Sequence, residues 1–195
     1  GGAGGGAPPG RVIAYEPEEK NFTLLKKNIE SNGFFWATPV REAVGDRAGT
    51  RTLFMANKHT GIHSFINNRN FDQKTEVACD TLDHSLEKLG LSKADVIKMD
   101  IEGFEIMALE GMQKTIAESD DLVMFLEFYP QAIARLDREP LSYLEMLHGL
   151  GLSLSVIDED ARKLVPLNPA DFKAFVESIP KTGEMVRNIR ATKQR

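Results

Sequence analysis

Three acidic residues each follow a short apolar run, a position from which a carboxylate can meet a ligand. They are Glu16 after residues 11–15, Asp100 after residues 94–99, and Glu127 after residues 122–126. Such runs are typical of buried strands, and in an open α/β sheet ligands bind beyond the carboxyl ends of the strands. We therefore expect the three acids to converge on one rim and to share one site. The simpler alternative for each is a solvated acid at a strand end.

The segment Lys98–Glu105, with the sequence KMDIEGFE, holds the densest group of acids. Asp100, Glu102 and Glu105 lie at an expected strand-to-helix turn, where Gly103 permits close approach of the backbone. One simpler interpretation is that Glu102 and Glu105 complement the positive end of the following helix dipole, which would stabilise each by about 0.3–1 kcal/mol. A hard-cation site is another, and we discount it because no His or further acid lies near in the sequence. We predict no metal.

A polar loop over residues 57–73 is the second place where reactive side chains gather. It is rich in Asn, His and Gly and too long for a tight turn, which indicates a functional loop. Histidine has an ordinary pKa of about 6.5, so His63 suits proton transfer, although a loop histidine is more often simply solvated. His59 and His63 have an H-x-x-x-H spacing, but Gly61 between them argues against the helix that a metal pair would need.

Apolar runs alternate with amphipathic stretches along the chain, which predicts an α/β fold. Strands are expected near residues 11–15, 36–44, 51–56, 75–79, 94–99, 122–126 and 152–157, and helices near residues 20–30, 81–89, 104–116 and 140–150. Strands alternating with helices of about ten residues imply right-handed crossovers and a mainly parallel sheet covered on both faces. The predicted fold class is a doubly wound α/β domain.

Both ends of the chain differ from this pattern. The first ten residues, GGAGGGAPPG, contain six glycines and two prolines. A phosphate-binding glycine loop needs a strand before it and a helix after it, and Pro8-Pro9 block such a helix. We predict a flexible leader over residues 1–10 and one domain over residues 11–195. The basic tail, residues 181–195, is expected to be a frayed, solvated terminus.

Charge and composition exclude several classes of partner. The chain has 24 Lys and Arg against 29 Asp and Glu, and the net charge of −5 lacks the basic footprint of non-specific nucleic-acid binding. A single cysteine, Cys79, excludes an internal disulfide and fits a reducing cytoplasm. The sequence has no apolar run long enough for a membrane span. The expected partner is a small molecule. The sequence does not decide between a monomer and an oligomer.

Six ordered sequence blocks resemble the FkbM family of S-adenosylmethionine-dependent methyltransferases. They are VIAYEPEEKNFTLLKKNIESNG, REAVGDRAGTRTLF, TGIHSF, VACDTLDHSL, ADVIKMDIEGFEIMALEGM and LVMFLEF. The most specific of them is KMDIEGFE with its downstream Leu-Glu-Gly. The resemblance implies the seven-strand Rossmann-like sheet of class I methyltransferases, S-adenosylmethionine as cofactor, and methylation of a hydroxyl on a sugar or natural product.

The same resemblance implies roles for individual residues on the cofactor side. Glu16, followed by Pro17, would bind the ribose of the cofactor, and Asp100 would lie beside the methyl sulfonium. The residues implied beside the adenine are Glu42, Ala43 and Val44.

On the acceptor side the resemblance implies a loop of small residues over the pocket. The matched loop residues are Thr60, Gly61, His63 and Ser64. The residues expected to contact the acceptor are Gly61, Ser64, Glu102 and Glu127. An alcohol is a poor nucleophile at pH 7, so a base within about 2.6–3.2 Å of its proton assists the attack on the methyl group. Asp100 is the first candidate for this base or for orienting the acceptor, and His63 is the second. Asp100 acting only on the cofactor is the alternative.

One part of the family pattern has no counterpart before Val12. The glycine motif, an Asp-x-Gly-Ala-Asn-x-Gly type loop joining the first strand to the first helix, is missing, and GGAGGG lies too close to Val12 to replace it. We therefore expect an N-terminally truncated member whose sheet lacks the first strand and helix. The alternative function is a non-catalytic Rossmann-like interaction module with an exposed sheet edge.

Overall fold

The computed structural model describes residues 10–55, 63–65, 71, 73–180, 182 and 185–193. The chain divides into two compact units, one that ends at Ala43 and one that begins at Val44. Apart from Gly10, the predicted leader lies outside the described residues. The single domain expected over residues 11–195 stays a prediction.

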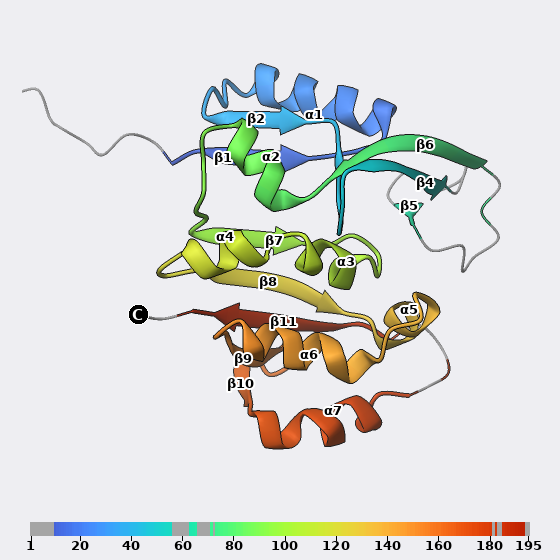
Figure 1. Ribbon diagram of the computed structural model, residues 1–195, viewed down its shortest axis with the longest axis vertical. Coiled ribbons are helices and arrows are strands. Elements are labelled where there is room, and N and C mark those ends of the chain that lie inside the picture. Colours follow the sequence, from blue (N-terminus) through green and yellow to red (C-terminus); the bar gives the residue numbers. More distant parts are fainter. Residues whose placement is uncertain are drawn as a thin grey trace, which may run out of the picture. The chain divides into compact units, whose positions relative to one another are not determined.

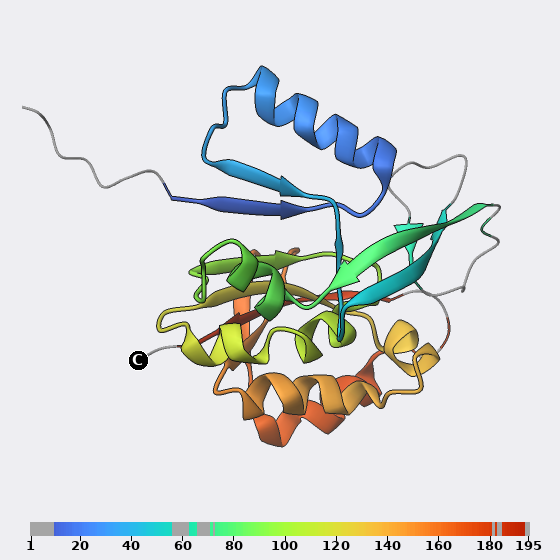
Figure 2. The same cartoon turned by 45° about the horizontal axis from the view of Figure 1, so that its top comes forward.

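The first unit is a strand-helix-strand motif (Figure 2). It consists of β1 (Val12–Tyr15), α1 (Glu19–Ser31) and β2 (Ala37–Val40). The two strands are parallel, with Val12 paired to Ala37, and the helix provides the crossover between them. The Glu18 carboxylate caps the helix by accepting a hydrogen bond from the Asn21 backbone N–H at 2.7 Å. β1 and α1 form close to the residues where the sequence pattern predicts a strand and a helix.

The second unit is built on a five-stranded sheet and a smaller four-stranded sheet (Figure 1). In sheet order, the larger one contains β10 (Lys163–Leu167), β9 (Ser153–Asp158), β11 (Arg187–Thr192), β8 (Val123–Phe128) and β7 (Val96–Met99). The smaller one contains β3 (Ala43–Val44), β6 (Gln73–Asp80), β4 (Gly49–Met55) and β5 (His63–Ser64).

The five-stranded sheet is mixed, which corrects one part of the predicted fold. β7 and β8 are parallel, but β11 is antiparallel to both β8 and β9, and β9 is antiparallel to β10. The α/β class is confirmed, whereas a mainly parallel, Rossmann-like sheet is not. The connections explain the difference, because a short turn at residues 159–162 permits only antiparallel pairing of β9 and β10. The strand β11 then runs between β8 and β9 in the opposite direction.

Most helices of the second unit lie along one face of the five-stranded sheet (Figures 1 and 2). The helical segments are α2 (Leu82–Lys88), α3 (Glu105–Glu110), α4 (Gln113–Glu118), α5 (Pro130–Arg135), α6 (Pro140–Gly149), a short 3-10 turn (Pro169–Asp171) and α7 (Phe172–Ser178). Side chains along these strands alternate between the face that the helices cover and the opposite face. Met124 and Leu126 of β8 are buried, while Phe125 between them is 39% exposed.

Several predicted boundaries are wrong, and the boundary of β8 changes the place of a predicted site residue. β8 extends to Phe128, so Glu127 lies inside the strand and does not follow it. The tail expected to be frayed contributes β11, a central strand whose Ile189 and Ala191 are fully buried. The strand expected at residues 36–44 is two strands, β2 and β3, which belong to different sheets.

The helix expected over residues 104–116 is also two helices, with a break at Gly111 and Met112. The Asp83 carboxylate starts the second helix by accepting hydrogen bonds from the Thr115 N–H at 2.7 Å and the Lys114 N–H at 3.1 Å. At the break itself, a Cβ on Gly111 would overlap the carbonyl oxygen of Gly45. The turn between α3 and α4 therefore needs a glycine because another part of the backbone lies against it.

We predict that Gly111→Ala destabilises the protein by about 3 kcal/mol, because the methyl group would force two backbone segments apart. Urea unfolding of the full chain measures the effect. The matched control is Gly149→Ala, at the end of α6, where an added Cβ meets no atom within 4 Å. This control is expected to be neutral or to gain about 0.5 kcal/mol. Equal stability of the two variants would contradict the packing described at Gly111.

Candidate functional site

The candidate site is centred on residues Asp100–Phe104, which we call the acid loop. The loop connects the end of β7 to the start of α3. Glu102 and Gly103 turn the backbone through left-handed conformations, with φ angles of 57° and 96°. The Asp100 side chain is about half exposed and accepts a hydrogen bond from the Lys98 ammonium group at 3.0 Å. The sequence thus correctly predicted a strand, an acid and a glycine turn in this order.

Glu127 joins the acid loop from the neighbouring strand. The parallel register pairs Met99 with Leu126. The residue that follows each of them is an acid, Asp100 after Met99 and Glu127 after Leu126. Burial raises the pKa of Glu127, and the negative charges of Asp100 and Glu102 raise it further, while Lys98 opposes them. The structure therefore brings together three of the predicted site residues. Their predicted roles in catalysis and in contacting the acceptor stay predictions.

Glu105 lies beneath the acid loop, where no pattern in the sequence predicts it. Its side chain is 1% exposed. One carboxylate oxygen accepts a hydrogen bond from the Ile101 backbone N–H at 3.0 Å. Burial raises the pKa of Glu105 to about 7, Glu127 raises it as well, and hydrogen bonds with the backbone of Ile101, Gly103 and Glu105 itself oppose the rise. The simpler interpretation, in which Glu105 only complements the helix dipole, does not predict that its side chain is buried.

A buried tyrosine of α6 completes the inner side of the site. Tyr143 is fully buried, and its hydroxyl has no hydrogen-bond partner among the residues that the structure describes. Burial raises the pKa of Tyr143 well above its ordinary value, and Glu105 and Glu127 add to this rise. The phenol thus lies within electrostatic range of both carboxylates.

The short strand β5 holds the acid loop from the other side. The Ser64 hydroxyl is buried and donates a hydrogen bond to the Glu102 carbonyl oxygen at 3.3 Å. The rings of Phe65 and Phe104 lie 4.7 Å apart. Ser64 was predicted to contact the acceptor, and the structure gives it a contact with the loop backbone.

Only part of the predicted polar loop belongs to the residues that the structure describes. His63 pairs through its backbone with Met55 in β4. Its side chain lies outside the described residues, and so do His59, Thr60 and Gly61. The predictions for these residues stay open.

Glu16 follows β1 in the first unit, as the sequence predicts. Its backbone N–H donates to the Val40 carbonyl at 3.0 Å, and its carboxylate accepts from the Glu18 N–H at 2.8 Å across Pro17. The other acids belong to the second unit, so the expectation that three strand-end acids share one rim stays a prediction.

The three residues predicted beside the adenine lie where the first unit ends and the second begins. Ala43 and Val44 form β3, in which Ala43 is 4% exposed. Glu42, directly before the strand, is half-buried. Their predicted contact with the cofactor stays a prediction.

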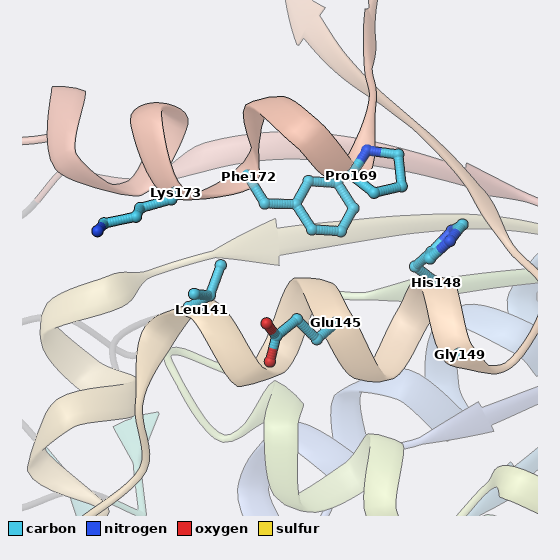
Figure 3. A pocket seen from close by; sticks show the side chains of 7 residues that line it. All are labelled: Leu141, Glu145, His148, Gly149, Pro169, Phe172 and Lys173. Atoms are coloured by element: carbon cyan, nitrogen blue, oxygen red, sulfur yellow. The ribbon is translucent and has the colours of Figure 1, made fainter.

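A pocket of about 280 Å³ lies elsewhere in the second unit, between α6 and α7 (Figure 3). Its lining includes Glu145 and His148 from α6 and Phe172 and Lys173 from α7. No predicted site residue lines it. In the described part of the chain, no group of three or more His, Cys, Asp or Glu side chains could hold a metal ion. The helices described there are all too short or too polar to cross a membrane.

We predict that Glu105→Gln stabilises the protein at alkaline pH but not at acidic pH. The pKa of Glu105 rises from 4.5 to about 7 on folding. The folded state therefore holds a proton that the unfolded state has lost, and stability falls as the pH rises from 4.5 to 7. The total loss is roughly 3 kcal/mol, and a neutral glutamine avoids it. Urea unfolding at pH 5 and pH 8 measures the difference between variant and wild type, and a difference independent of pH would contradict the prediction.

Comparisons with known proteins place the chain in a family. The family profile described as the Methyltransferase FkbM domain matches residues 6–153. A search of curated proteins finds no match. Among solved structures the chain is similar to the crystal structure of methyltransferase FkbM from Methylobacillus flagellatus KT, with 14% identity and a TM-score of 0.49. The alignment covers 93% of this chain and 36% of that one, so this chain spans about a third of that protein's length. Since the family profile matches well over half of its residues, the chain belongs to the FkbM methyltransferase domain family.

Proposed function

We propose that the chain is an S-adenosylmethionine-dependent O-methyltransferase that acts on a hydroxyl of a sugar or natural product. One observation carries the proposal. In a chain of a methyltransferase family, the ends of the parallel strands β7 and β8 carry three acids close together, Asp100, Glu102 and Glu127. Ligands of α/β sheets bind at this end of the strands.

The chemistry of these residues fits the proposed cofactor. S-adenosylmethionine carries a positive sulfonium and an ammonium group, and its ribose hydroxyls donate hydrogen bonds. Burial raises the pKa of Glu127, and the charges of Asp100 and Glu102 raise it further, so a cation beside these acids would relieve their mutual repulsion. Asp100 is the residue proposed to lie beside the sulfonium. When bound, the cofactor supplies the methyl group.

Glu16 is proposed to accept hydrogen bonds from the ribose hydroxyls. It is an acid directly after a parallel strand and before a helix, the placement of ribose-binding acids in dinucleotide folds. The proposed neighbours of the adenine are Glu42, Ala43 and Val44.

The acids of the second unit are proposed to orient the acceptor and to remove its proton. Asp100 is the first candidate for the base. Glu127 becomes a further candidate, because a carboxylate whose pKa is raised accepts a proton more readily than an ordinary one. His63 stays an alternative base. Glu102 is proposed to contact the acceptor, together with Gly61 and Ser64.

A second candidate function is an interaction module that does not catalyse a reaction. The observation that favours it is the position of β7 at the edge of its sheet. On this strand Val96 is 63% exposed, and an exposed edge strand can pair with a strand of a partner protein. Cofactor binding discriminates between the two functions.

We predict that the full chain binds S-adenosylhomocysteine with micromolar affinity and that Glu16→Ala abolishes this binding, because the ribose hydroxyls lose their acceptor. Isothermal titration calorimetry measures the affinity. Glu30→Ala, an exposed acid at the end of α1, is the matched control and should bind as wild type does. Absence of binding at millimolar ligand in the wild type would reject the methyltransferase proposal for this chain.

We also predict that Asp100→Asn abolishes methyl transfer while leaving the affinity for S-adenosylhomocysteine nearly unchanged. The amide keeps the shape of the carboxylate but cannot accept the acceptor's proton. Turnover and calorimetry on the same preparation separate the two effects. An equal loss of both would make Asp100 a cofactor-binding residue and leave the base to Glu127 or His63.

A further inference from the structure

The acid loop has an unfavourable backbone conformation that something must hold in place. Glu102 is not a glycine, yet its φ angle is 57°, in the left-handed region. Such a conformation costs about 1–3 kcal/mol and persists only where the surrounding structure imposes it. The loop carries Asp100 and Glu102, so whatever imposes its conformation also determines where these two acids lie.

The Glu105 carboxylate makes the contacts that can impose this conformation. It accepts a hydrogen bond from the Ile101 N–H at 3.0 Å, and it also bonds with the backbone of Gly103. These two residues flank Glu102 on either side. The carboxylate therefore bridges the two peptide segments between which the left-handed turn occurs.

The carboxylate of Glu105 is buried away from bulk solvent. Its side chain is 1% exposed, so the hydrogen bonds to the loop act in a region of low dielectric constant. Two titratable groups from other elements face it, Glu127 of β8 and Tyr143 of α6. Neither offers the carboxylate a positive charge. Its stabilising partners are the backbone N–H groups of the loop.

We propose that Glu105 is a positioning residue, whose buried carboxylate holds the backbone of the acid loop and thereby sets where Asp100 and Glu102 lie beside Glu127. It deepens the proposed function, on which the importance of this position for methyl transfer rests. Glu105 itself touches neither the cofactor nor the acceptor in this proposal.

The role makes the loop sensitive to pH. The ionised carboxylate accepts from several N–H groups, whereas protonation converts one oxygen into a donor and weakens these bonds. Burial raises the pKa of Glu105 to about 7, and the hydrogen bonds with the loop backbone lower it. A local opening that breaks these bonds but leaves the carboxylate buried is therefore favoured by protonation, so the loop is held more firmly above neutral pH than below it. Global unfolding exposes the carboxylate and changes with pH in the opposite direction. An exposed glutamate, with a pKa near 4.3, would not change over this range.

Amide hydrogen exchange of the full chain, followed by NMR, tests the proposal without any need for activity. After correction for intrinsic rates, protection of the Ile101 amide should rise by up to about tenfold from pH 6 to pH 8, the limit set by the ionised fraction of a group with a pKa of about 7. In Glu105→Gln the protection should not change with pH. The control Glu118→Gln, an exposed glutamate at the end of α4, should behave as wild type.

A second variant keeps the test decisive if Glu105→Gln does not fold. Glu127→Gln removes a charge that raises the pKa of Glu105, so the rise in protection should move to lower pH. Constant protection of Ile101 in the wild type would overturn the proposal. So would an unshifted transition in Glu127→Gln, or a wild-type rise in Glu105→Gln.

The pH profile of kcat provides a readout that a purely structural role would not change. Wild type should gain rate through pH 7, and in Glu105→Gln this gain should be lost, which leaves only the titration of the proposed base in the profile. A wild-type profile in Glu105→Gln would overturn the positioning role. If wild type neither binds S-adenosylhomocysteine nor transfers a methyl group, the proposed function is rejected, and the exchange data decide the role of Glu105 alone.

Discussion

The parallel pairing of β7 with β8 is the constraint on which the candidate site depends. Pairing Met99 with Leu126 brings Asp100 and Glu127 side by side, since each is the next residue of its strand. Burial raises the pKa of Glu127, and the repulsion between these two close carboxylates raises it further. A slip of one residue in this register would separate the acids and also turn the buried Met124 and Leu126 away from the helices.

The parts of the site that follow from local pattern could be predicted from the sequence. Asp100 after an apolar run and Gly103 at the turn are signals contained in a few neighbouring residues. Glu105 gave no such signal, because an acid in the first turn of a helix is ordinarily exposed. Its burial results from β8 and α6, which lie far along the chain. The same reason explains β11, whose Ile189 and Ala191 are too few to identify a central strand until β8 and β9 are placed beside it.

The Leu-Glu-Gly sequence has a structural explanation that its resemblance to a methyltransferase motif does not provide. Gly111 lies against the backbone of Gly45, and a Cβ on Gly45 would in turn lie 2.8 Å from the Cys79 sulfur. The Gly45 N–H donates to the Asp80 carbonyl at 2.9 Å. These contacts join the turn between α3 and α4 to the smaller sheet of the second unit. A glycine in a family motif can thus be required for packing alone, and catalytic roles need separate evidence.

The position of β11 also has a consequence for how the second unit forms. This strand lies between β8 and β9, but it is synthesised after both of them. Until it emerges from the ribosome, β8 and β9 each lack a neighbour on one side and expose a hydrogen-bonding edge that can pair with other chains. The five-stranded sheet is therefore completed by long-range contacts only after β11 is made, which is the situation in which folding is slow and aggregation competes with it.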